Sequence, residues 1–375
     1  MRDKMTTTTF PEGHATRTLG GPSSRCCSED LLARYRAIIE QESFGWTEYH
    51  RLLRPLGSGG QGVVYLSERR GTDNFTLPVA LKIFSPERYS DEHAYDDAMG
   101  RIAQVAAKVA LIQQDNLLDV HNWVERHRIR FMEMEWVDGY DLSQLLTSKM
   151  LDYLYHHVSM QRWSKINEVI VTAGPSQPRL KPGIAVAIIR DCLAALAALH
   201  RHGIVHGDVK PSNIMLKRTG NAKIVDMGSA VELSNLPPVR TCSPAYAAPE
   251  VLEGGECTPR SDLASLGYVL VEMLSGTQPF DGRPSLRDLL EAKRFLAQRL
   301  PQILPADVVR NELLMNFCRS LIAPDPMRRF PSAEAADLLT DSSAAAFLRQ
   351  LVKGDLAAEY DNEIRIWLAE LEDMK

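Results

Sequence analysis

The stretch His206-Gly207-Asp208-Val209-Lys210-Pro211-Ser212-Asn213 places an acid, a cation and an amide close together along the chain. A second stretch, Asp226-Met227-Gly228, adds another carboxylate directly after Ile224-Val225, an apolar pair typical of a strand. Carboxylate and amide oxygens are ligands that Mg²⁺ prefers, and a nearby ammonium neutralises phosphate charge. Each stretch alone is weak evidence, and its meaning depends on the motifs that lie upstream.

Upstream, glycines recur in Gly57-Ser58-Gly59-Gly60-Gln61-Gly62-Val63-Val64. A glycine-rich turn lets backbone N–H groups approach a phosphate without a side-chain clash. The pattern alone is weak, because an ordinary glycine-rich hairpin reads the same way. A dinucleotide-binding loop is disfavoured, since that motif opens a helix whereas Val63-Val64-Tyr65-Leu66 continues as a strand.

Between these stretches, Val79-Ala80-Leu81-Lys82 reads as a strand that ends in a lysine. A lysine after three apolar strand residues is expected to be more than a solvated surface group. Its ammonium can grip the phosphates of a nucleotide. The glycine-rich loop, the lysine, the Asp208 stretch and the Asp226 stretch then form the set that phosphoryl transfer from ATP requires.

In this order and with these gaps, the four motifs resemble those of a eukaryotic-type (Hanks-type) serine/threonine protein kinase, and the loop around Gly207 is most similar to bacterial members. The resemblance covers roughly residues 50–335. It implies an α+β, bilobal protein-kinase-like fold. Residues 46–137 would form a small β-rich N-lobe with one helix, and residues 138–340 a larger, mainly helical C-lobe.

The resemblance also implies the cofactors and the roles of the site residues. ATP and Mg²⁺ (or Mn²⁺) would bind, and serine or threonine hydroxyls of a protein substrate would accept the phosphoryl group. Asp208 would act as the base, while Lys210 and Lys82 would neutralise phosphate charge. Asn213 and Asp226 would hold the metal. The other expected nucleotide-binding residues are Gly57, Ser58, Gly59, Gly60, Gln61, Gly62, Val64, Ala80, Glu135, Val137, Asp141 and Met215.

Asp141 has two readings, because an aspartate at this point can bind the ribose hydroxyls or cap the N-terminus of a helix. Both stay open on the sequence. His206 is expected to be a structural hydrogen-bonding residue rather than a base. The pair His156-His157 is expected to be solvated, since no cluster of metal ligands stands beside it.

Residues 241–250 resemble the segment that receives the peptide substrate. By this resemblance Ser243 would bond the catalytic aspartate and lysine, and Glu250 would form a buried pair with Arg329. Asp262 would brace the backbone of the catalytic loop. Gly207 replaces an arginine that usually pairs with a phosphorylated activation loop, so we expect this loop to be ordered without phosphorylation.

The sequence departs from the family at the partner of Lys82. Kinases hold this lysine with a glutamate on the next helix, but no glutamate lies between Glu92 and Glu125. The family's position maps to Gln104, Val105 or Ala106, and of these Gln104 could hydrogen-bond the lysine but could not neutralise its charge. Asp96 or Asp97 could serve only if the register of the helix shifted.

Two alternative functions stay open. An ATP-binding pseudokinase, acting as a scaffold with weak or no transfer activity, is consistent with the missing glutamate. A scaffold, however, need not keep all four of Lys82, Asp208, Asn213 and Asp226. A small-molecule phosphotransferase of kinase-like fold is disfavoured, because such enzymes generally lack the Ala-Pro-Glu segment found at 248–250.

The composition bounds the class of protein. The chain has 375 residues, 45% of them hydrophobic, and a net charge of -5, which is ordinary for a globular protein of two lobes with tails. This charge gives no reason to expect nucleic acid as a partner. On the sequence, no stretch approaches the roughly 20 consecutive apolar residues that a membrane span requires, so we expect no membrane span and a cytoplasmic location. The six scattered cysteines predict neither a zinc site nor a disulfide framework.

Three segments lie outside the two lobes or interrupt them. Residues 1–45 are expected to be a disordered tail with a short helix near residues 31–39. An insertion at about residues 147–181 is expected to be helical at first and then a loop. Residues 341–375 are expected to be a helical extension with an apolar stripe at Ile364, Trp367, Leu368 and Leu371. The stripe would pack on the domain or, as the alternative, make 344–375 a partner-binding helix.

Overall fold

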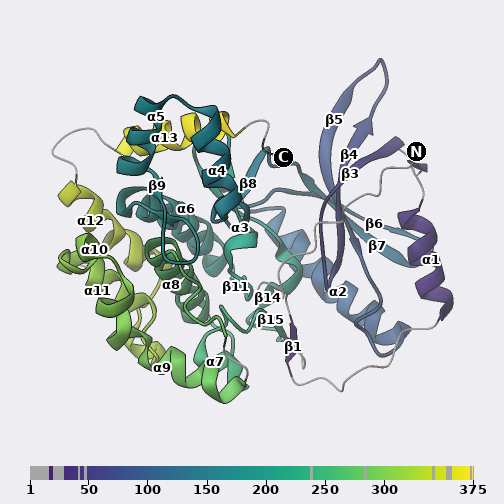
Figure 1. Ribbon diagram of the computed structural model, residues 1–375. Coiled ribbons are helices and arrows are strands. Elements are labelled where there is room, and N and C mark those ends of the chain that lie inside the picture. Colours follow the sequence, from purple (N-terminus) through teal and green to yellow (C-terminus); the bar gives the residue numbers. More distant parts are fainter. Residues whose placement is uncertain are drawn as a thin grey trace.

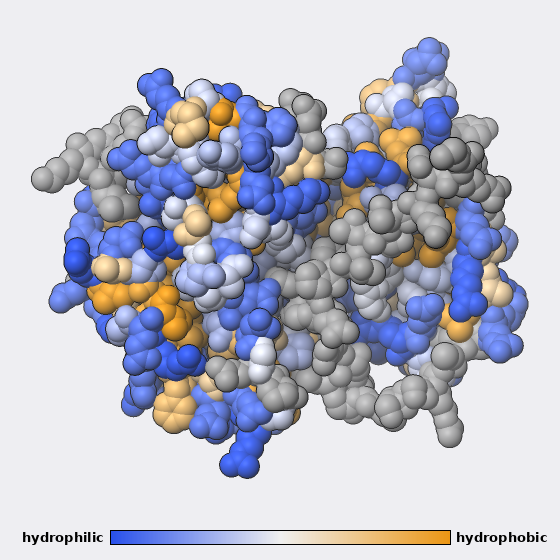
Figure 2. All heavy atoms as spheres, viewed as in Figure 1, coloured by the Kyte–Doolittle hydropathy of each residue, from blue (hydrophilic) through white to orange (hydrophobic). Residues whose placement is uncertain are grey.

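The computed structural model describes residues 17–19, 29–40, 43–45, 49–236, 240–282, 285–339, 343–351, 357–371 and 374. A β-rich lobe and a helical lobe lie side by side (Figure 1). The predicted bilobal α+β fold is confirmed. The face seen in Figure 2 is mostly hydrophilic, because the apolar residues of both lobes form an extensive buried core.

The N-lobe contains one antiparallel sheet of six strands in the order β2-β3-β4-β5-β7-β6. The strands are β2 (Ser43–Gly45), β3 (Tyr49–Gly59), β4 (Gly62–Arg70), β5 (Thr76–Phe84), β6 (Val120–Arg126) and β7 (Ile129–Glu135). The turn at residues 71–74 joins β4 to β5, with φ of 55° at Asp73 and 62° at Asn74. Aspartate and asparagine tolerate this left-handed region better than other side chains, so the hairpin turns here.

Two helices pack in the N-lobe. The long helix α2 (Glu92–Val109) begins at Asp91, whose side chain accepts a hydrogen bond from the backbone N–H of Ala94. The short helix expected near residues 31–39 forms as α1 (Glu29–Ile39), which contacts β7. Its buried residues Leu31, Leu32, Tyr35 and Ile38 join the hydrophobic core.

The C-lobe is mainly helical. Its helices are α3 (Leu142–Leu145), α4 (Ser148–His157), α5 (Met160–Val169), α6 (Pro182–Arg201), α7 (Pro249–Leu252), α8 (Pro259–Ser275), α9 (Leu286–Ile303), α10 (Ala306–Val309), α11 (Glu312–Leu321), α12 (Ala344–Leu351) and α13 (Ala357–Glu370). Single 3₁₀ turns occur at Pro211–Asn213, Met227–Ser229 and Pro326–Arg328, and a π-helical turn at Ala335–Leu339.

Short strands of the C-lobe carry the loops of the site. The strands β8 (Gly139–Asp141), β12 (Ile214–Lys217) and β13 (Ala222–Ile224) form a small sheet in the order β13-β12-β8. The strands β11 (Ile204–Val205) and β14 (Val231–Glu232) pair with each other. The Asp208 stretch lies between β11 and β12, and the Asp226 stretch lies between β13 and β14. The pairing of these four strands therefore brings the two stretches together.

Helix α6 corrects one expectation. It is long and apolar enough to span a membrane by length and composition, whereas the sequence had suggested that no segment comes close. Its apolar window is 72% buried inside the fold, which is typical of a core helix. It was the one helix among the described residues to meet the length and composition criteria.

The insertion and the C-terminal extension pack against each other. Helices α4 and α5 are followed by a two-stranded sheet, β9 (Val171–Thr172) with β10 (Arg179–Leu180), where a plain loop was expected. Arg162 on α5 pairs with Glu363 at 2.8 Å and Glu370 at 2.6 Å on α13. The hydroxyl of Tyr140, beside the link between the lobes, donates to the carbonyl of Leu371.

The alternative that residues 344–375 bind a partner protein through their apolar stripe is wrong, because the stripe is buried in the chain's own core. Helix α13 contacts α6 of its own chain. The stripe residues are no more than 1% exposed and belong to the core: Ile364, Trp367, Leu368 and Leu371. Their apolar surface is already removed from water, so it offers no binding energy to another protein.

Residues 1–45, expected to be a disordered tail with a short helix, contain two strands among their described residues. β1 (Arg17–Leu19) pairs antiparallel with β15 (Arg240–Cys242), and Thr18 lies opposite Thr241. β2 pairs with β3 in the N-lobe sheet. The expectation of disorder is therefore wrong for residues 17–19 and 43–45. Residues 1–16 and 20–28 lie outside the described residues.

Candidate active site

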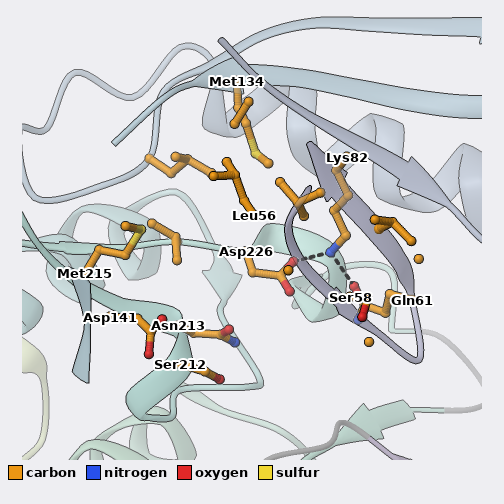
Figure 3. A pocket seen from close by; sticks show the side chains of 18 of the residues that line it. Leu56, Ser58, Gln61, Lys82, Met134, Asp141, Ser212, Asn213, Met215 and Asp226 are labelled. Carbon is orange, nitrogen blue, oxygen red and sulfur yellow. Dashed lines mark hydrogen bonds and ion pairs between the residues drawn. The ribbon is translucent and has the colours of Figure 1, made fainter. Parts of the chain in front are cut away.

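A cleft of about 570 Å³ lies between the two lobes. Figure 3 shows its walls, with Leu56 and Met134 from the N-lobe facing Met215 and Asn213 from the C-lobe. All the predicted nucleotide-binding residues line it: Gly57, Ser58, Gly59, Gly60, Gln61, Gly62, Val64, Ala80, Lys82, Glu135, Val137, Asp141 and Met215. The structure therefore brings together residues that are spread over most of the two lobes.

The glycine-rich loop is the hairpin between β3 and β4. Gly59 pairs with Gly62 at its tip. Gly62 has φ of 135°, and a Cβ added there would overlap the carbonyl of Ile83 on the neighbouring strand β5. Only glycine, which has no Cβ, lets the backbone at position 62 lie this close to β5. The loop itself lines the cleft.

Lys82 projects from β5 into the cleft and has two partners there. Its Nζ forms an ion pair with Asp226 and donates a 2.7 Å hydrogen bond to Gln61 Oε1 (Figure 3). Burial raises the pKa of Asp226, but the charge of Lys82 and the hydrogen bond from it outweigh burial and hold that pKa at about 2. Asp226 is therefore a carboxylate at any pH near neutrality.

Gln104, which the sequence left as a possible partner of Lys82, does not replace the family's glutamate. Its side chain on α2 is exposed, while the two residues that follow it, Val105 and Ala106, are apolar and buried. Asp96 pairs with Arg128 and Arg130 of the β6–β7 hairpin. Gln104 and Asp96 of α2 therefore lie on faces of the helix that do not contact Lys82.

Asp208 and Lys210 form a buried cluster with Ser243, which lies in residues 241–250, the segment expected to receive the substrate and called the substrate segment below. Asp208 Oδ1 accepts a 2.9 Å hydrogen bond from the backbone N–H of Ser243, and Asp208 Oδ2 lies 2.9 Å from Lys210 Nζ. Lys210 also donates to Ser243 Oγ at 2.9 Å. The carboxylate, the ammonium and the hydroxyl are held in one arrangement, as the sequence had implied.

Asn213 is fixed by Asp208. Its Nδ2 donates to the Asp208 carbonyl at 2.8 Å, and Asn213 and Asp226 both line the cleft. Amide and carboxylate oxygens are hard ligands of the kind Mg²⁺ prefers, and Mg²⁺ commonly takes only one or two protein ligands beside phosphate oxygens and water. Within the described residues no group of three or more His, Cys, Asp or Glu could hold a metal alone. These two residues fit a metal that arrives with a nucleotide.

Asp262 supports the catalytic loop from α8. Its carboxylate accepts hydrogen bonds from the backbone N–H groups of His206 at 2.8 Å and Gly207 at 2.9 Å, and it also contacts His200 Nε2 at 2.9 Å. His206 is fully buried, and its Nε2 contacts the carbonyl of Val225 at 3.1 Å. These bonds match the bracing and structural roles expected of Asp262 and His206.

Gly207 has a backbone reason to be glycine. Its φ is 74°, and a Cβ added there would lie 2.9 Å from the carbonyl oxygen of Ser229. A larger residue, including the arginine usual in the family, would be strained in this conformation.

The substrate segment is anchored by a buried ion pair. Arg329 donates from Nη1 to Glu250 Oε1 at 2.6 Å and from Nη2 to Glu250 Oε2 at 2.8 Å. Arg329 is 3% exposed and also donates to backbone carbonyls, including that of Ala323 at 2.7 Å. This two-bond geometry fixes the end of the segment, as the resemblance implied.

Asp141 caps helix α3, because its side chain accepts from the backbone N–H of Gln144 at 3.1 Å. It also lines the cleft, so the capping role is present and the ribose role stays a prediction. Burial raises the pKa of Asp141 to about 6, against the opposing hydrogen bonds from Ser143 and Gln144.

Sequence reasoning missed several residues of the cleft. Tyr35 reaches its rim from α1, and Ser212 and Gln144 line its C-lobe side. The signal for Ser212 was its place in the catalytic loop. Nothing in the local sequence of Tyr35 points to the cleft, because α1 is brought there only by packing on the N-lobe.

Comparison with known proteins agrees with this geometry. Residues 50–339 match the protein kinase domain family. The chain is 29% identical over 332 residues to the serine/threonine-protein kinase PrkC of Bacillus subtilis (strain 168), covering 87% of this chain and 43% of PrkC. It is 32% identical over 317 residues to the serine/threonine-protein kinase PknD of Mycobacterium tuberculosis (strain ATCC 25618 / H37Rv), covering 82% of this chain and 42% of PknD.

A third relative is the serine/threonine-protein kinase PknL of the same Mycobacterium tuberculosis strain, 31% identical over 236 residues, 62% of this chain and 50% of PknL. The chain spans about half the length, or less, of these curated relatives. The matched region contains both lobes and every residue of the cleft described above from Leu56 onward. The chain belongs to the protein kinase family, within its serine/threonine kinases.

Proposed function

We propose that this protein transfers the γ-phosphoryl group of ATP to serine or threonine hydroxyls of protein substrates. The observation that carries the proposal is the buried cluster of Asp208, Lys210 and Ser243, next to a cleft that Lys82, Asn213 and Asp226 line. A base, phosphate-binding cations and metal ligands thus surround one space large enough for a small-molecule ligand.

Each residue would act through the contacts it makes. Asp208 would accept the proton of the substrate hydroxyl, while Lys210, 2.9 Å from that carboxylate, would face the phosphoryl group as it transfers. Lys82 would bind the phosphates of ATP. Asn213 and Asp226 would hold Mg²⁺ or Mn²⁺, which when bound neutralises charge on the phosphate oxygens.

The peptide would approach along the segment that follows β15. Lysine at position 210 and a hydroxyl residue at 243 are the pattern that the resemblance assigns to serine/threonine kinases. Ser243 is 1% exposed and bonded to both Asp208 and Lys210, so it would hold these two side chains in a fixed orientation. This arrangement favours protein over small-molecule acceptors.

The test compares the wild type with Asp208→Asn. Purified protein is incubated with γ-labelled ATP, Mg²⁺ or Mn²⁺, and generic protein substrates. We expect label to appear on serine or threonine with the wild type and to fall by 10³-fold or more with Asp208→Asn, while ATP binding by calorimetry stays nearly unchanged. No transfer by the wild type, together with intact ATP binding, would leave the scaffold as the function.

A further inference from the structure

Lys82 lacks the partner that α2 should have supplied, yet its ammonium is 3% exposed and therefore needs one. The exposed position of Gln104 and the pairing of Asp96 with arginines exclude both as partners. Asp226 neutralises the charge of Lys82 but is also the residue expected to hold the metal. The question is which other residue keeps the lysine in place.

Gln61 at the tip of the glycine-rich loop contacts Lys82 directly. Its Oε1 accepts the 2.7 Å bond from Lys82 Nζ, and its Nε2 donates to Ser229 Oγ at 2.8 Å. A lysine ammonium can only donate, so the amide oxygen has to be the atom that faces it. Gln61 is 8% exposed, and both ends of its amide are thus satisfied inside the cleft.

The contact extends from the loop to the substrate segment. Ser229 Oγ lies 3.0 Å from Thr241 Oγ1 on β15, two residues before Ser243. A continuous set of side-chain bonds therefore runs from Lys82 through Gln61 and Ser229 to Thr241. The N-lobe lysine and the segment that carries Ser243 are joined by it.

Gly228 provides the space for this amide. A Cβ added at Gly228 would overlap Gln61 Oε1 and would lie 2.8 Å from Lys82 Nζ. Any side chain at this position would displace Gln61 from the lysine. The absence of a side chain at 228 is thus a condition of the contact.

We propose that Gln61 is a positioning residue for Lys82, taking the place of the glutamate that α2 lacks. The inference rests on the proposed function. The glycine-rich loop itself, once closed, orients the ammonium toward the phosphate site, and its closure is linked through Ser229 and Thr241 to the substrate segment. In this protein the orientation of the lysine depends on the loop and not on the helix.

The kinetic test uses Gln61→Ala and Gln61→Glu, with Gln104→Ala as the matched control. Because the contact holds Lys82 toward the phosphate site, its loss should weaken ATP binding. We expect Gln61→Ala to lower kcat/KM for ATP about tenfold, mainly through a higher KM, which corresponds to about 1.4 kcal/mol. Gln61→Glu keeps an acceptor of the same length, so it should recover at least threefold of that loss. Gln104→Ala, whose side chain is exposed, should match the wild type.

A second measurement does not need activity. Lysines of the nucleotide-free full-length protein are acetylated with acetic anhydride, and the labelling rate of Lys82 is followed by peptide mass spectrometry. Gln61→Ala should raise that rate at least threefold, while Lys223, which pairs with Glu135, serves as the internal reference. An unchanged rate in Gln61→Ala, or a Gln61→Glu variant no better than Gln61→Ala in either assay, overturns the proposal. A wild type that labels as expected but transfers no phosphate contradicts the proposed function alone.

Discussion

Ser243 donates its backbone N–H to Asp208 Oδ1 over 2.9 Å, although the two residues lie on different loops. The bond joins the catalytic loop to the segment expected to receive the substrate. The orientation of the Asp208 carboxylate therefore depends on the conformation of that segment. A local change in the segment should alter the position of this carboxylate.

Ser243→Ala removes the hydroxyl that accepts from Lys210 at 2.9 Å but keeps the backbone bond to Asp208. We expect kcat toward a protein substrate to fall about threefold to tenfold, in line with the loss of one hydrogen bond to a charged group. ATP affinity should be unchanged. Steady-state kinetics check this, with Ser243→Thr as the control that retains the hydroxyl. Equal losses in both variants would show that the hydroxyl is not the group that matters.

Arg329→Ala leaves the carboxylate of Glu250 without its two-bond partner and several carbonyls without a donor. We expect the free energy of unfolding to drop by about 3–5 kcal/mol, which is the cost of breaking a buried ion pair from one side. Arg329→Lys should not restore it, because an ammonium lacks the planar fork. Urea unfolding measures both.

The double variant Arg329→Ala with Glu250→Ala tests the cause of that loss. Removing the second partner also removes the unpaired charge, so the combined cost should be smaller than the sum of the two single costs. Strict additivity would mean that the two side chains act independently of each other.

We expect the stability of the fold to depend on pH through the buried side chain of Glu272. Burial raises its pKa to about 7, although hydrogen bonds from Tyr246 and Gln177 oppose the shift. The folded state then holds this proton more tightly than the unfolded chain does. The contribution of Glu272 to stability is therefore fully present below its ordinary pKa of 4.5 and is lost as the pH rises toward 7.

Glu272→Gln keeps the hydrogen-bonding shape without the titration. We expect the difference in the free energy of unfolding between pH 5 and pH 8 to shrink by about 2 kcal/mol in this variant. Denaturant unfolding at the two pH values checks it, with Glu256→Gln on the exposed surface as the control. An identical pH dependence in wild type and Glu272→Gln would contradict the assignment.

The pairing of β1 with β15 predicts slow amide exchange in residues 240–242. Neighbouring residues of a strand point their N–H groups to opposite edges, so one of residues 17 and 18 donates into this ladder, and proline at that position must remove the bond. We expect Arg17→Pro or Thr18→Pro to speed hydrogen–deuterium exchange at 240–242. Thr18→Val, which favours strands, should leave it unchanged. Exchange that is equally fast in all three and in the wild type would mean that the strand pair does not persist.

Much of the fold and of the cleft was predictable, because it depends on local patterns. The run Val79-Ala80-Leu81-Lys82 predicted the strand that carries Lys82. The Asp208 and Asp226 stretches predicted the two loops that carry these acids, because the residues of each stretch are close neighbours along the chain. The glycines, Lys82, Asn213 and Asp226 of the cleft belong to these motifs, whereas Tyr35 does not.

The neighbours of these motifs were less predictable. Gln104 and Gln61 are both glutamines that a sequence reading could place near Lys82, yet one is exposed on α2 and the other is buried against the lysine. A helix that rotates by one residue turns a side chain through about 100°, and local sequence does not set that rotation. The apolar stripe of α13 was ambiguous for a different reason, because the same stripe suits packing on the domain or on a partner.

The sequence by itself determined which groups form the candidate site, since the motifs that hold Lys82, Asp208, Asn213 and Asp226 are short and the chain itself fixes the spacing within each motif. Only the tertiary structure decided which residue holds the lysine. Gln61 and Ser229 lie 168 residues apart along the chain, and only the packing of the two lobes brings them within hydrogen-bonding distance. Contacts of this kind depend on the relative placement of whole elements, which no local pattern of residues encodes.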